Sequence, residues 1–138
     1  MRAGRLLLAG LWLAVAARAE PGFDYRLEAV AVTRDVGVFL GRSEDFSRTN
    51  GGNIVNTGFI VTAAGVVVID TGPSRRYGEQ MRAALERMGA GPVLRVFNTH
   101  HHPDHVLGNQ AFAGGSIAAL AATREGIVRD GNAFAENL

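Results

Sequence analysis

The residues best suited to chemistry are the four histidines of the chain, which all lie within residues 100–105. In an extended segment, residues two apart point the same way, so His100 and His102 can present their imidazoles to one metal ion. The chain then turns at Pro103, which lets Asp104 and His105 face a second ion. Imidazole and carboxylate are ligands that suit zinc. The spacing therefore predicts that these two pairs bind two zinc ions.

Two zinc ions placed side by side have a defined chemistry. Ions about 3.5–4 Å apart can share a water molecule, lower its pKa toward about 7 and supply a hydroxide nucleophile. We therefore expect zinc-dependent hydrolysis, with Asp104 as the catalytic residue as well as a ligand. His101 projects opposite to its neighbours and is interpreted as a packing or supporting residue. The alternative is an exposed histidine-rich tract that binds metal incidentally.

The elements around the cluster must hold it at an edge of the fold. Residues 93–98 form a short apolar run that reads as a buried strand and leads directly into the histidines. Residues 104–112 are predicted to be helical. The cluster therefore lies between the end of a strand and the start of a helix, where α/β enzymes place their ligand-binding loops. This position argues against an exposed histidine-rich tract that binds metal incidentally.

The rest of the chain alternates predicted strands and helices, which indicates an α/β layered fold. Ser74 is the expected N-cap of a helix that carries apolar residues at helical spacing and stops at Gly89. The run 66–69 lacks alternation, so it is predicted to be buried on both faces. The other expected strands are 27–33, 36–40, 54–62, 93–98 and 116–120, and a last helix is expected over 121–137.

Two motifs resemble a known family. Residues 99–105, Thr-His-His-His-Pro-Asp-His, look like the signature loop of metallo-β-lactamase-fold hydrolases, and residues 66–72, Val-Val-Val-Ile-Asp-Thr-Gly, are similar to its second marker. The resemblance implies that His100 and His102 hold one zinc and that Asp104 and His105 contribute to the other. Asp70 matches an aspartate that supports the metal ligands from behind. Stabilisation of the turn before the following helix is an alternative role for Asp70, compatible with the first.

A narrower resemblance covers residues 44–46, 50–54, 70–80 and 98–112. These segments look like the exported zinc metallohydrolases of quinoprotein relay systems, which implies a small-molecule substrate and a functional link to a quinoprotein dehydrogenase. Glyoxalase II-like enzymes and many β-lactamases carry a Gly-Gly pair where this chain has Gly108-Asn109, which argues against a direct assignment to either. The glycine-rich residues 51–53 are interpreted as a loop tip, with the lining of a substrate pocket as the alternative.

The resemblance also implies an architecture. The superfamily fold is a four-layer αββα sandwich of two similar halves, and its second half supplies a third histidine, a bridging aspartate and a last histidine. This chain has no histidine after His105, and its later acidic residues, Glu125, Asp130 and Glu136, have no ligand-like context. We therefore expect residues 20–138 to be the N-terminal half of the sandwich, within a longer protein.

The first 19 residues have the layout of a secretory signal peptide. A basic start is followed by the apolar run 6–16, which is shorter than the roughly 20 residues that span a bilayer. A short membrane anchor or a buried helix is the alternative. Cleavage after Ala19 leaves 11 basic residues against 13 acidic ones, so no nucleic-acid partner is implied. The absence of cysteine excludes disulfides and thiolate ligands and suits a bacterial periplasmic or secreted protein.

Two further function classes remain open at this point. The chain can belong to a non-hydrolytic accessory or metal-binding protein of a periplasmic quinoprotein oxidation pathway. It can also belong to a di-iron redox protein, since the same scaffold holds iron with a closely related ligand set.

Overall fold

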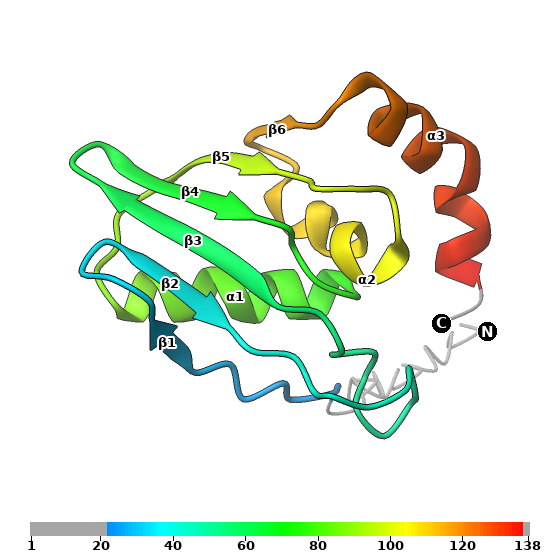
Figure 1. Cartoon of the computed structure of the whole chain (residues 1–138), viewed down its shortest axis with the longest axis horizontal. Coiled ribbons are helices and arrows are strands. Elements are labelled where there is room, and N and C mark those ends of the chain that lie inside the picture. The colour runs from blue at the N-terminus through cyan, green and yellow to red at the C-terminus, as the bar shows by residue number, and fades with distance from the viewer. Residues whose placement is uncertain (1–21, 137–138) are drawn as a thin grey trace, which may run out of the picture.

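The computed structural model describes residues 22–136, so the predicted signal peptide lies outside the described residues. One six-stranded sheet is covered on one face by a long helix (Figure 1). The strands are β1 Ala29–Ala31, β2 Val36–Phe39, β3 Thr57–Thr62, β4 Gly65–Ile69, β5 Val93–Phe97 and β6 Ser116–Ala118. The helices are α1 Arg75–Arg87, α2 Pro103–Val106, the 3₁₀ helix η1 Leu107–Phe112 and α3 Ala121–Glu136. Within residues 22–136, no helix is both long and apolar enough to cross a membrane.

The strands lie in the sheet in the order β1-β2-β3-β4-β5-β6, which is their order along the chain. The first four strands pair antiparallel, and β4, β5 and β6 pair parallel. Parallel neighbours need a crossover connection, and α1 provides it between β4 and β5. The carboxyl ends of β4 and β5 therefore meet at the same edge of the sheet, and the histidine segment follows β5 there.

Helix α1 begins and ends where the sequence predicts. The Ser74 hydroxyl accepts a hydrogen bond from the Tyr77 backbone N–H at 3.0 Å, and Gly89 follows the helix with a φ of +68°. Its apolar face is buried against the sheet. The core consists of the following buried residues, drawn from α1, the turn after it, the strands and η1: Phe39, Phe59, Val66, Val68, Tyr77, Met81, Ala84, Leu85, Ala90, Val96, Ala111 and Phe112.

The prediction that residues 66–69 are buried on both faces is wrong for the described residues. Val66 and Val68 are fully buried against α1, but Val67 and Ile69 on the opposite face are only partly buried. The neighbouring strands share this open apolar face: Ile60 of β3 is paired with Val67 and is 38% exposed, and Phe97 of β5 is paired with Ile69 and is 41% exposed. The absence of alternation therefore reflects a sheet that is apolar on both faces and covered by a helix on one.

Several predicted elements have different bounds, and two of the differences have a cause in the hydrogen bonds. Strand β3 begins at Thr57 and not at residue 54, because the Asn56 side chain accepts from the Gly41 N–H (3.0 Å) where the ladder would continue. The helix predicted over 104–112 is divided into α2 and η1. At the division, the Gly108 N–H donates to Gly72 O at 3.0 Å and so leaves the α-helical pattern.

The buried Tyr77 should make stability sensitive to high pH. Burial raises the pKa of Tyr77 to about 12, and its hydrogen bond to the Thr57 hydroxyl (2.9 Å) only partly opposes this. Because the pKa of Tyr77 in the folded state exceeds the ordinary value of 10.0, the protonated side chain favours the folded state. This contribution to stability is complete below pH 10 and is lost as the pH rises toward 12. Two pKa units correspond to about 2–3 kcal/mol. In urea unfolding at neutral pH, the free energy of unfolding of Tyr77→Phe should be about 1–3 kcal/mol below that of the wild-type chain, because the Thr57 hydroxyl loses its partner. Between neutral and alkaline pH, however, the free energy of unfolding of this variant should fall by less than that of the wild-type chain. Equal alkaline losses in both proteins would contradict this.

Candidate metal centre

The four predicted metal ligands lie on the segment that leaves β5 and on α2, which follows it in Figure 1: His100 and His102 lie in the connection, and Asp104 and His105 lie in α2. The ring of His100 lies 4.6 Å from that of His102 and 4.0 Å from that of His105, measured between centroids. The Asp104 carboxylate lies 3.6 Å from His105 Nε2. The four side chains therefore lie close together and form one cluster.

His101 faces helix α3, in keeping with its interpretation as a packing residue. Its Nε2 lies 3.8 Å from the Asp130 carboxylate. A Cβ added to Gly126 would lie 2.6 Å from His101 Cγ, so a glycine is required where α3 passes this ring. The side chain thus holds α3 beside the histidine segment.

Asp70, directly after β4, lies behind the cluster and is only 2% exposed. Its Oδ1 accepts from the Thr99 backbone N–H at 2.8 Å, and its Oδ2 accepts from the Thr99 hydroxyl at 2.7 Å. His105 Nδ1 lies 2.8 Å from the same Oδ2. Asp70 has a φ of +58°, a left-handed conformation that aspartate tolerates better than most residues. The carboxylate therefore orients His105 from the side opposite to Nε2.

The ionisation of the site follows from these contacts. Burial raises the pKa of Asp70, but hydrogen bonds from His105 and Thr99 outweigh it and leave the pKa below its ordinary value. Burial lowers the pKa of His100, and the neighbouring His105 and His102 lower it further. These contacts therefore favour an ionised Asp70 carboxylate and a neutral His100 imidazole, and the neutral imidazole is the form of histidine that binds metals.

Backbone contacts join the segment after β4 to the segment after the histidines. The Thr71 N–H donates to His105 O at 2.8 Å, and the Gly108 N–H donates to Gly72 O at 3.0 Å. A Cβ on Gly108 would lie only 1.9 Å from Thr71 O. This close approach requires glycine and fixes the backbone of His105 against the end of β4.

A partly buried group of two amides and a hydroxyl strengthens the same junction. Asn98 and Asn109 pair through their side-chain amides, at 2.8 Å and 3.2 Å, and the Thr71 hydroxyl donates to Asn109 Oδ1 at 3.0 Å. Sequence reasoning missed all three residues, and it also missed Thr99. The position of Thr99 directly before His100 could have identified it as a site residue. The pairing of Asn98 with Asn109, by contrast, is evident only in three dimensions.

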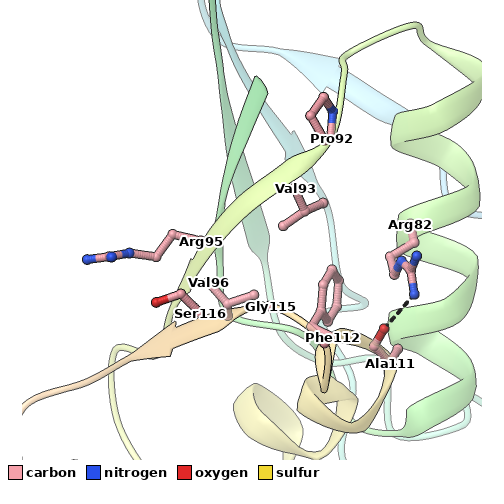
Figure 2. A pocket seen from close by; sticks show the side chains of 10 residues that line it. Arg82, Pro92, Val93, Arg95, Val96, Ala111, Phe112, Gly115 and Ser116 are labelled. Atoms are coloured by element: carbon pink, nitrogen blue, oxygen red, sulfur yellow. Dashed lines mark hydrogen bonds between the residues drawn. The ribbon is translucent and has the colours of Figure 1, made fainter. Parts of the chain in front are cut away.

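Two of the cavities among residues 22–136 are lined by residues other than the four predicted metal ligands. One of about 360 Å³ is lined by Val93, Val96 and Phe112, and Arg82 borders it by donating to Ala111 O at 2.8 Å (Figure 2). No histidine lines this cavity, so it is separate from the cluster. The other, of about 420 Å³, is lined by the predicted glycine loop together with aromatic residues: Phe23, Tyr25, Phe46, Gly51 and Gly52.

The donors of the cluster suit zinc in kind but are incomplete in number. Neutral imidazole and carboxylate are zinc ligands. Within residues 22–136, however, no group of three or more His, Asp or Glu side chains is arranged to hold one ion. An ion bound here would therefore need water or other protein groups to complete its coordination.

Comparisons with solved structures agree with the fold. Solved metallo-β-lactamases from Pontibacter korlensis (TM-score 0.65, 21% identity) and Hirschia baltica (TM-score 0.61, 23% identity) match 76% and 75% of this chain. The chain covers 48% of each of them. These likenesses concern the fold, and they confirm the expected α/β layered architecture as the N-terminal part of a metallo-β-lactamase fold.

Sequence comparison gives the family. A linear primary-alkylsulfatase of Pseudomonas sp. (strain ATCC 19151) is 33% identical over 48 residues, which is 35% of this chain and 9% of that protein. The family model of the metallo-beta-lactamase superfamily matches residues 50–135, well over half of the chain. This match includes the histidine cluster, Asp70 and the residues that pack behind them, and the chain therefore belongs to the metallo-β-lactamase superfamily.

Proposed function

We propose that this chain provides part of the active site of an exported zinc-dependent hydrolase. The observation that supports this best is the cluster of His100, His102, Asp104 and His105 with the buried Asp70 carboxylate behind it. Zinc bound there would activate water as a nucleophile. The chain's residues would hold the metal, and Asp104, the predicted catalytic carboxylate, would lie beside the reacting water. Asp70 would fix the orientation of His105.

We further propose a periplasmic location and a link to a quinoprotein dehydrogenase. The location rests on the signal-peptide layout of residues 1–19, and the link rests on the segments that resemble relay-system metallohydrolases. The predicted charge balance of the processed chain favours a small-molecule substrate over nucleic acid. Metal analysis of protein purified from the periplasm would separate zinc from the iron of the di-iron alternative.

Zinc binding tests the proposal directly. The 138-residue chain should bind zinc weakly in calorimetric titration and show no appreciable ester or lactam hydrolysis. With so few protein ligands for each ion, bound water keeps a pKa nearer the value of about 9 for aqueous zinc than about 7. His102→Ala should abolish the remaining binding.

His101→Ala is the matched control, because this neighbouring ring faces α3 and should leave zinc binding unchanged. No zinc binding by the wild-type chain would contradict the metal function. Two tight sites with measurable hydrolysis would contradict the incomplete ligand set.

A further inference from the structure

The hydroxyl of Thr99 lies between the Asp70 carboxylate and the ring of His100. Thr99 Oγ1 is 2.7 Å from Asp70 Oδ2 and 3.0 Å from His100 Nδ1. A threonine hydroxyl has one hydrogen to donate and lone pairs with which to accept, so its two partners cannot both receive that hydrogen.

The hydrogen positions follow from what each partner can supply. An ionised carboxylate only accepts, so the short contact to Asp70 requires the Thr99 hydroxyl to donate. The hydroxyl oxygen must then accept from His100, which places the imidazole proton on Nδ1. The opposite arrangement would set two acceptors 2.7 Å apart with no hydrogen between them.

We propose that Thr99 is a positioning residue that holds His100 in its Nδ1–H tautomer and so presents Nε2 to the metal. The same Asp70 oxygen accepts from His105 Nδ1, so one carboxylate sets the tautomers of both rings, directly for His105 and through Thr99 for His100. Each ring then turns its Nε2 away from Asp70. His105 Nε2 indeed lies on the side away from Asp70, where it faces the Asp104 carboxylate.

The relevance to metal binding rests on the proposed function, but the tautomer can be measured without metal. Nitrogen-15 spectra of the metal-free chain at about pH 8 should show His100 protonated at Nδ1. The chain has only four histidines, and a His100→Gln variant assigns the signal. Thr99→Val should move His100 toward the Nε2–H form that free imidazoles favour, and Thr99→Ser should keep the wild-type form.

Zinc titration gives a second readout. Removing a group that orients a ligand typically lowers metal affinity 10–100-fold, so we expect about this loss in Thr99→Val and little loss in Thr99→Ser. Valine keeps the branched shape at this exposed position, and the backbone N–H still donates to Asp70, so the urea midpoint should change little.

Three results would overturn the assignment: an Nε2–H tautomer in the wild-type chain, an unchanged tautomer in Thr99→Val, or equal losses of zinc affinity in both variants. If the tautomer changes as expected but the wild-type chain binds no zinc, the assignment of Thr99 holds and the proposed metal function fails. The two failures are therefore distinguishable.

Discussion

Gly108→Ala should destabilise the protein by about 3 kcal/mol or more, at the upper end of the cost of overpacking. The new methyl group would lie 1.9 Å from Thr71 O and 2.7 Å from Thr71 C, which are backbone atoms that cannot rotate away. Relief requires the segment after β4 to separate from α2 and η1. That movement would break the hydrogen bond from Thr71 to His105 O, so the histidine cluster should loosen together with the core. Urea unfolding followed by circular dichroism measures the loss.

Gly114→Ala is the matched control. It lies six residues further along the chain, has no atom within 4 Å of the added Cβ and does not need a left-handed backbone. Its unfolding midpoint should stay near that of the wild-type chain. If the two variants were equally stable, the close approach at Gly108 would have no energetic significance.

Asp70→Asn should lower both the stability of the protein and its affinity for zinc. The new amide can accept hydrogen bonds only at its oxygen, whereas Asp70 accepts from Thr99 and His105 at both oxygens. At least one buried donor loses its acceptor, at a cost of about 1–3 kcal/mol. Zinc affinity should fall about 10–100-fold, because His105 is no longer held from behind. Asparagine tolerates the left-handed backbone at this position, so the loss reports the carboxylate and not backbone strain.

Asp130→Asn provides the comparison for Asp70. The Asp130 carboxylate contacts His101 and Arg129 outside the cluster, so its neutralisation should leave zinc affinity unchanged. Calorimetric titration and urea unfolding of both variants test the difference. Equal zinc affinities of Asp70→Asn and the wild-type chain would rule out the orienting role of Asp70.

Much of the fold could be predicted because its determinants are local. Ser74 and Gly89 bound α1 through contacts with their own helix, and β-branched runs mark β3 and β4. The proximity of the histidines was also predictable, since a few residues between a strand and a helix hold them all. Asp70 was found from its place in a motif that resembles a family marker.

The parts that could not be predicted depend on contacts between distant segments. Thr71 and Asn109 are 38 positions apart, and only the packing of η1 against the end of β4 brings them together. The division between α2 and η1 depends in the same way on Gly72, which accepts from Gly108. The open face of the sheet could not be predicted from residues 66–69, because an apolar run does not determine which faces of the strand other elements cover.

The order of the strands also bears on how the protein is made. Each strand after β1 pairs with the strand that the ribosome produced just before it, so only β1 has to wait for its first partner. Such neighbouring contacts favour rapid folding, and domains generally fold from their N-terminal side during synthesis. The sheet can therefore grow by one strand at a time, and the histidine segment is anchored between β5 and α2 as soon as these two have emerged. The zinc-binding geometry that we propose is thus prepared early in the life of the polypeptide, by its own neighbours in the chain.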